Sequence, residues 1–400
     1  MSDYDDPIAL TIASALHKLD YTKLKGVNVT GINRKENVHF VKGLLNSFGL
    51  NDVPVVEGTE EYDPNDWDKE RLEITNKRRD VMMSNSENTN WQRYHQLLTK
   101  LDTSKIGDTE RRDHLQLCSD IFDQAKESGK KVIRVITTGL QTLDTYLQDS
   151  NRANKFKENT LKIINQGGIK YENNSLVPNE NARNMYYNIN SSKKVLKYIK
   201  ENKIPINCWT KNSAIACSMN GSFLIELSKE SNKGIKIINE LRESVDAHQF
   251  WNTLNPKGTF SKSFFTTEMF LKYKTTLPDE KISEIANEFK KKYGEKSNDQ
   301  VTMDDYEEYF KDYKKVLGNK SNLIIYDALT ILDILDQNLK DKLQLSVPYE
   351  MDQDPELEKY CKVFGKTPSN PGLNVKNTQD VIIALTKYAV HSSSNERSKI

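Results

Sequence analysis

The chain has 400 residues and a mass of 46.1 kDa, which is enough for one large domain or two ordinary ones. Its 58 lysines and arginines nearly balance 57 aspartates and glutamates, so a net charge of +1 supplies no overall field to attract nucleic acid or an anionic membrane. No run of about 18 apolar residues is present, which excludes a membrane-spanning helix.

The cysteines and the first residues of the chain indicate the compartment. Four cysteines lie without any CxxC spacing or dense framework, which argues against structural zinc and for reduced thiols. The opening MSDYDDPIAL is acidic and lacks the basic and then apolar order of a signal peptide. We therefore expect a cytoplasmic protein with no membrane partner and no nucleic-acid partner.

Short β-branched runs recur along the chain and predict strands of a buried sheet. Each run is apolar and is closed by Gly, Asn, Asp or Thr, as is typical of parallel strands covered on both faces. The runs are GVNVTGI (26–32), DVPVVEG (52–58), KVIRVITTG (131–139), LKIINQGG (161–168), IPINCW (204–209) and NLIIYD (322–327).

Amphipathic stretches lie between these runs and predict helices. Asp6 is positioned to cap a helix with Pro7 at its first position, and that helix would bury Ile8 and Ile12. Asn33 opens a capping box at the start of a second helix. Strands alternating with helices predict an α/β fold with an open, mostly parallel central sheet flanked by helices.

Two stretches interrupt the alternation. Residues 58–108 are rich in Asp, Glu, Asn, Lys and Trp, which indicates a polar insertion. Residues 275–317 alternate charges on a helical period, which indicates a projecting helical insertion. With no repeat and no clear linker, residues 1–400 are predicted to form a single domain.

The acidic segment around Asp3, Asp5 and Asp6 is the most informative part of the sequence for function. Three carboxylates entering a helix N-terminus repel one another unless a positive group lies among them. A hard divalent cation such as calcium or magnesium accepts such oxygen ligands. The alternative is a solvated acidic start with one capping aspartate.

This segment resembles the DxDxGxDD signature of nucleoside hydrolases of the inosine–uridine-preferring family, with Asp5 and Asp6 at its last two aspartates. Four later segments are similar to family segments in the same order. They are residues 26–58 (a strand, a Gly-Asn turn, a helix and a "DVPV-x-G" strand), 136–147 ("TGPLTNLA"), 164–189 ("GG…N…AEFN") and 324–335 ("HDPLAVA").

The resemblance implies a calcium site and a ribose site. Asp6, the carbonyl of Thr142 and Asp327 would bind calcium. Asp5 would hold the ribose and, with Asp3, supplies the catalytic candidates. The candidates for the remaining substrate contacts are Asn33, Asn184, Glu180 and His248, although His248 beside Phe250 and Trp251 is also compatible with ordinary packing.

The implied activity is hydrolysis of the N-glycosidic bond of a ribonucleoside or a related ribosyl compound by a calcium-activated water. Such a reaction passes through an oxocarbenium-like state that carboxylates stabilise. The implied partner is a small-molecule nucleoside whose base the sequence does not specify. Whether the protein is a homo-oligomer stays open.

Several positions depart from the family pattern, among them Asp3 in place of the signature's glycine and Gln166 in place of a methionine. Met1 stands at about the position of the signature's first aspartate, Ala182 replaces the glutamate of the ribose stretch, and Tyr326 replaces the histidine before the last aspartate. We therefore expect either a further strand upstream of Met1 or a loss of full catalysis. The alternatives are a non-catalytic protein that binds a nucleoside or ribosyl compound, and an interaction protein on the same fold.

Overall fold

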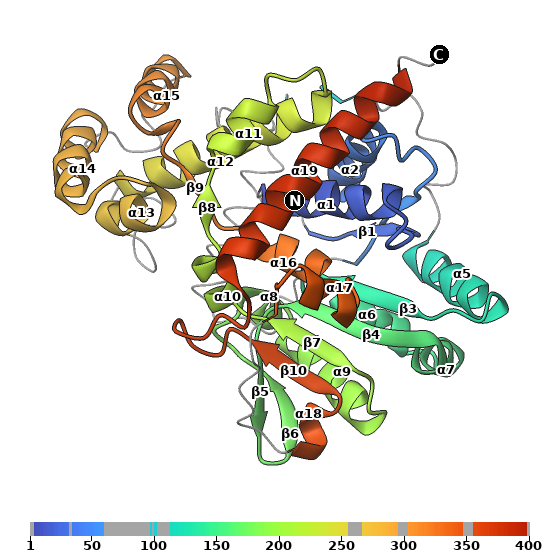
Figure 1. The fold of residues 1–400 in the computed structure, drawn as a ribbon. Coiled ribbons are helices and arrows are strands. Elements are labelled where there is room, and N and C mark those ends of the chain that lie inside the picture. The colour runs from blue at the N-terminus through green and yellow to red at the C-terminus, as the bar shows by residue number, and fades with distance from the viewer. Residues whose placement is uncertain are drawn as a thin grey trace.

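The computed structural model describes residues 4–31, 34–59, 97, 100–101, 113–254, 266–294, 303–346 and 355–397 (Figure 1). The elements are, in chain order, α1 (Asp5–Lys18), β1 (Val27–Val29), α2 (Arg34–Ser47), β2 (Val55–Glu57), α5 (His114–Glu127), β3 (Val132–Ile136), α6 (Gln141–Leu147), α7 (Ser150–Asn159), β4 (Thr160–Gln166), β5 (Ile169–Glu172), β6 (Ser175–Pro178), α8 (Arg183–Tyr186), α9 (Ile189–Glu201), β7 (Ile206–Trp209), α10 (Lys211–Ala216), β8 (Met219–Asn220), α11 (Ser222–Leu227), α12 (Lys233–Leu254), α13 (Thr267–Lys274), α14 (Asp279–Tyr293), α15 (Met303–Leu317), β9 (Asn322–Leu323), α16 (Tyr326–Leu332), α17 (Gln337–Lys342), α18 (Pro355–Glu358), β10 (Cys361–Phe364) and α19 (Val375–Arg397).

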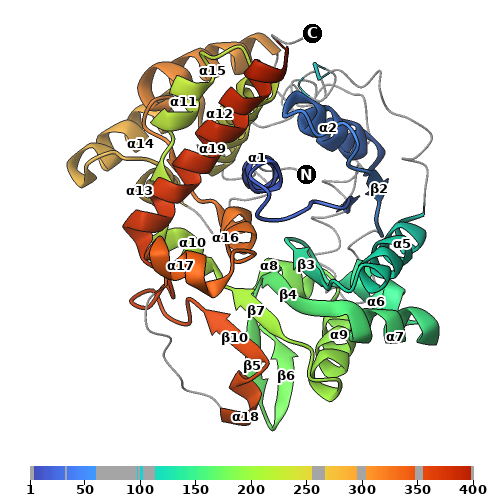
Figure 2. The ribbon, with the colours of Figure 1, turned by 45° about the vertical axis from the view of Figure 1, so that its right-hand side comes forward.

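The central sheet has four parallel strands in the order β10-β7-β4-β3. Successive residues of β4 point to opposite faces, so that Ile163 packs with α5, α6, α7 and α9 while Ile164 packs with the residues of α1, α16 and α19. Both faces of the sheet are thus covered by helices (Figure 2). The predicted α/β class, with an open parallel sheet flanked by helices, is confirmed.

The first two predicted strands pair with each other. β1 and β2 form a two-stranded parallel sheet in which Val27 lies opposite Val55. Helix α2 covers this pair through Val41 and Leu45, both fully buried. These strands and the helix between them bring Thr30 and Gly58 to the ends of β1 and β2, facing the start of α6.

The predicted strand over residues 322–327 is wrong for most of its length. Only β9 is extended there, and it pairs with β8 in an antiparallel ladder outside the central sheet. Tyr326 and Asp327 instead begin helix α16. Leu323 and Ile325 are fully buried in the core beside α1, so their hydrophobicity reflects packing rather than a central strand.

Helix α1 begins one residue earlier than the predicted cap. Asp6 does not cap it; the N-cap position is Tyr4, and Asp5 and Asp6 both lie in the first turn. Ile8, Ile12 and neighbouring residues face the core as predicted, with exposed fractions of 1% and 0%. Because α1 packs against both α16 and α19, its first turn is held in the middle of the protein (Figure 2).

Helices α13, α14 and α15 lie together at one side of the protein, around the C-terminal half of α12 (Figure 1). Their shared core is rich in aromatic side chains, among them Phe250, Trp251 and Tyr309.

The two helices α14 and α15 fall in the segment predicted as a helical insertion, whose boundaries stay a prediction. The predicted polar insertion at 58–108 lies almost wholly outside the described residues. Within the described chain no helix combines the length and the hydropathy needed to cross a bilayer.

Truncating the buried face of α1 tests this arrangement. Ile12 is fully buried, so Ile12→Ala removes core contacts and leaves a cavity, which costs about 2 to 5 kcal/mol of unfolding free energy. The measurement is urea unfolding followed by circular dichroism. As the matched control, Tyr21→Ala changes a side chain that is 56% exposed and should shift the free energy by less than about 0.5 kcal/mol.

Candidate metal and ligand site

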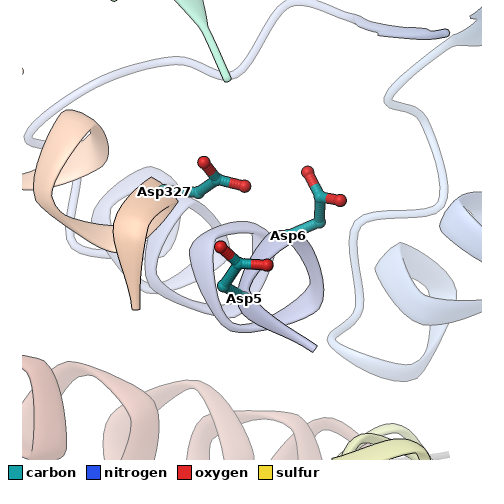
Figure 3. A group of neighbouring side chains, drawn as sticks. All are labelled: Asp5, Asp6 and Asp327. Carbon is teal, nitrogen blue, oxygen red and sulfur yellow. The ribbon is translucent and has the colours of Figure 1, made fainter. Parts of the chain in front are cut away.

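Three carboxylates from opposite ends of the chain come together at the first turns of two helices. Asp5 and Asp6 lie in the first turn of α1, and Asp327 lies in the first turn of α16. One carboxylate oxygen from each of the three lies within 4.8 Å of the others (Figure 3). We call this group the carboxylate cluster.

The carboxylate cluster is electrostatically unfavourable by itself. Asp5 and Asp327 are only 8% and 4% exposed, so water screens their charges poorly. Two like charges about 4 Å apart repel by about 4 kcal/mol at the effective dielectric constant of a protein surface. The helix N-termini offset part of this repulsion, since each carries about half a positive charge. A bound cation would offset the rest.

The spacing of the oxygens suits one calcium ion. Calcium–oxygen distances are about 2.3 to 2.6 Å, so two ligands on opposite sides of one ion are about 4.6 to 5.2 Å apart. Oxygens that all lie within 4.8 Å of one another can therefore surround one ion without moving apart. Carboxylate oxygens are also the ligand type that a hard divalent cation prefers.

Tyr4 links the start of α1 to the segment that leads into α16. Its side chain is fully buried, and its hydroxyl accepts a hydrogen bond of 3.0 Å from Lys274 Nζ. The Ile324 amide lies 3.5 Å from the same hydroxyl. Lys274 itself lies 3.7 Å from a carboxylate oxygen of the buried Asp246. Tyr4 thus fixes the position of Asp5 relative to Asp327.

The C-terminal ends of β3 and β4 lie next to this cluster. Thr137, which follows β3, donates a hydrogen bond of 3.5 Å from its hydroxyl to Asp6 Oδ1. The Asn184 side-chain amide donates to the carbonyl oxygens of Thr137 at 2.9 Å and of Gln166 at 3.2 Å. It also donates to the side-chain oxygen of Gln166. Thr137 therefore connects the carboxylate cluster with Asn184.

Of the other predicted site residues, the structure describes Thr142, Glu180 and His248. Asp3 and Asn33 lie outside the described residues. Thr142 lies in α6, where its hydroxyl is 2.8 Å from that of Thr59. The role of its carbonyl as a calcium ligand stays a prediction.

Glu180 is exposed, in the turn before α8. His248 lies on α12, where its Nε2 is 3.0 Å from the Asn252 amide nitrogen. The roles of Glu180 and His248 likewise stay predictions.

Sequence reasoning did not identify Thr137, Gln166 or Tyr4 as site residues. Thr137 and Gln166 are polar residues at the C-terminal ends of parallel strands, which is where open α/β sheets place their ligands. That position is a usable signal once the strands are known. The role of Tyr4 depends on contacts with distant parts of the chain, so no local pattern indicates it.

The comparisons with known proteins show a shared fold. No family model and no curated protein sequence matches this chain. The type III effector protein XopQ, solved in complex with adenosine diphosphate ribose, is similar over 97% of this chain and 90% of its own, with 16% identity and a TM-score of 0.65. The effector protein XOO4466 is similar over 97% and 91%, with 16% identity and a TM-score of 0.66. An inosine–uridine-preferring nucleoside hydrolase from Bacillus anthracis, at 13% identity over 97% of both chains, gives a TM-score of 0.49, which is too low to support an argument.

Replacing Asp327 by asparagine tests the cluster as a cation site. Without divalent cations we expect Asp327→Asn to unfold at the wild-type temperature or above it, because one of three repelling charges is removed. Calcium should raise the unfolding temperature of the wild type and leave that of the variant unchanged. Scanning fluorimetry with calcium or EDTA measures both effects.

Asp380→Asn is the matched control for this experiment. Asp380 is an exposed carboxylate paired with Lys376 on α19, far in the sequence from the cluster, so its variant should respond to calcium as the wild type does. An equal calcium response in the wild type and in Asp327→Asn would contradict the assignment.

Proposed function

We propose that this protein binds the ribosyl part of a nucleoside or a related ribosyl compound at the carboxylate cluster, together with calcium, and hydrolyses its N-glycosidic bond. The observation that carries the proposal is the convergence of Asp5, Asp6 and Asp327 beside the C-terminal ends of β3 and β4. A second support is the fold shared with XopQ, a protein solved with adenosine diphosphate ribose.

The calcium ligands would be Asp6 and Asp327, with the Thr142 carbonyl as the further donor that the resemblance implies. When bound, the ion supplies positive charge that makes a nearby water more acidic and orients sugar hydroxyls. The remaining chemistry falls to the residues of the chain. Asp5 is mostly buried beside both metal ligands, which suits a carboxylate that accepts a proton from the attacking water.

The three carboxylates also favour the transition state. Cleavage of a ribosyl C–N bond develops positive charge on the sugar ring, as in other glycoside hydrolysis. Carboxylates fixed in place before the reaction stabilise that charge without reorganisation. Asn184 contributes through its Oδ1, because its amide nitrogen already donates to the ends of β3 and β4. Oδ1 is then oriented to accept a hydrogen bond from a ribose hydroxyl.

The second candidate function is binding of a ribosyl compound without hydrolysis. Tyr326, the first residue of α16, stands where the resembled family has a histidine. A histidine with a pKa of about 6.5 exchanges protons near neutral pH, whereas a phenol with a pKa of about 10 retains its proton. Protonation of the leaving base would therefore be weaker in this protein. The complex of XopQ with adenosine diphosphate ribose also favours this candidate.

Release of the free base distinguishes the two functions. We expect the wild type with calcium to release base from at least one of inosine, uridine and adenosine, and EDTA to abolish the release. Asp5→Asn should lower kcat by at least about 100-fold, because the proton acceptor is lost. Chromatography of the reaction mixture measures the base. No turnover of any of these nucleosides would remove the hydrolase proposal.

Calorimetry tests binding separately from turnover. We expect adenosine diphosphate ribose or a nucleoside to bind with calcium present, and Asn184→Ala to weaken binding by about tenfold, since one hydrogen bond and the local geometry are lost. Asn181→Ala removes an exposed amide from the turn just before α8 and serves as the control. No binding of any of these ligands would contradict both candidate functions.

A further inference from the structure

A cavity lies on the α16 side of the central sheet, at the opposite end of α16 from the carboxylate cluster. Its volume is about 300 Å³, at the lower end of the range for small-ligand pockets, about 300 to 1,000 Å³. Asp327 begins α16 and Asp333 follows its last residue, so about 9 Å of helix separates the two. The cavity is therefore distinct from the carboxylate cluster.

The buried carboxylate of Asp333 forms the polar floor of this cavity. Its side chain is 1% exposed, and one oxygen accepts hydrogen bonds from the Asn207 amide at 2.7 Å and the Trp209 indole at 3.0 Å. The other oxygen pairs with Lys162 at 3.4 Å and with Lys340. Burial by itself raises the pKa of Asp333, but Lys340 and Lys162 outweigh it and lower the pKa below its usual value.

Among the described residues around the cavity, lysines outnumber carboxylates. Asp333 is the single acidic residue among the described lining residues, and Lys340 and Lys362 both line the cavity. Lys162 adds a third ammonium group behind Asp333; burial is the main cause that lowers its pKa, and the charges of Lys340 and Lys362 add to this against the attraction of Asp333. For Lys362, no acidic partner is seen in the part of the chain that the structure describes. One carboxylate thus faces three lysines.

Leucine and aromatic side chains form an apolar wall of the cavity. Leu329 and Leu332 come from α16, and Leu345 and Leu373 come from the segments around α17 and α19. The rings of Trp209 and Phe364 stack at 4.3 Å on the sheet side. At the rim, Gln337 donates a hydrogen bond of 3.1 Å to Ser346. A cavity with a charged end and an apolar wall suits a ligand with the same two parts.

We propose that this cavity binds a small organic anion, with a carboxylate or phosphate group at Lys362 and Lys340 and an apolar group against the leucines. The carboxylate of Asp333 does not prevent this, because Lys162, Lys340, Asn207 and Trp209 already contact its two oxygens, and the ammonium group of Lys340 has further N–H donors for the anion. The anion supplies negative charge beside Lys362, an exposed lysine at the open side of the cavity for which the described residues offer no acidic partner. The inference is independent of the proposed function.

Calorimetry with simple probes tests the proposal on the full chain in the presence of EDTA. The probes are benzoate, phenyl phosphate and neutral benzyl alcohol. We expect at least one of the two anions to bind and benzyl alcohol to bind at least tenfold more weakly. Binding of benzoate but not phenyl phosphate identifies a carboxylate as the head group, and the reverse identifies a phosphate. No binding of either anion, or equal binding of the alcohol, would overturn the proposal.

Two variants locate the binding. Lys362→Gln should weaken anion binding by at least about tenfold, because one of the two ammonium groups that face the anion is lost. Its matched control is Lys359→Gln, which changes an exposed lysine paired with Glu356 and should bind within twofold of the wild type. Ser346→Phe changes an exposed residue at the rim and should block both anions by filling the cavity.

A third variant separates this cavity from the carboxylate cluster. Asp327→Asn should leave anion binding unchanged, whatever its effect on calcium. If anion binding persists unchanged in Lys362→Gln and Ser346→Phe, or is lost in Asp327→Asn, the anion binds elsewhere and the proposal fails. Thermal unfolding of each variant establishes that it is folded before it is titrated.

Discussion

The gathering of three negative charges in a poorly solvated place is the constraint on which the rest of the structure depends. Asp5 and Asp327 are both mostly buried, and their oxygens lie within 4.8 Å of each other and of Asp6. All three groups carry negative charge, so they repel one another, whereas the partners of an ion pair attract each other. The packing of α1 against α16 and α19, and the hydrogen bonds of Tyr4, must therefore hold them together. Core packing is used here to keep the three carboxylates close together.

Helix α16 connects the two sites that we propose. Its first turn carries Asp327, which belongs to the carboxylate cluster. Asp333, just beyond its last residue, pairs with Lys162 and Lys340 at the floor of the cavity. Both aspartates are buried, but their surroundings differ. Asp327 meets two further carboxylates, which favours a cation, whereas Asp333 is surrounded by donors and ammonium groups, which leaves excess positive charge for an anion.

Sequence patterns predicted the central strands well where hydrophobicity and β-branching agree. β3, β4 and β7 lie in predicted runs because each is rich in apolar, mostly β-branched residues. β10 was missed, since Lys362 interrupts its short apolar pattern at the edge of the sheet. The run at 322–327 was wrong because a buried connection and a buried strand have the same composition, and only the hydrogen-bonding partners distinguish them.

The sequence by itself determined the residue types that the proposed chemistry needs and the alternation that produces an α/β fold. It placed Asp5 and Asp6 at the start of a helix, because their charges, Pro7 and the following apolar spacing are all local properties. The resemblance predicted that Asp327 joins Asp6 and that Asn184 belongs to the site. Only the tertiary structure decided that Thr137 connects Asp6 with Asn184 and that Asp333 is surrounded by lysines. These contacts join residues far apart in the chain, and their geometry follows from how helices pack on the sheet rather than from any local preference.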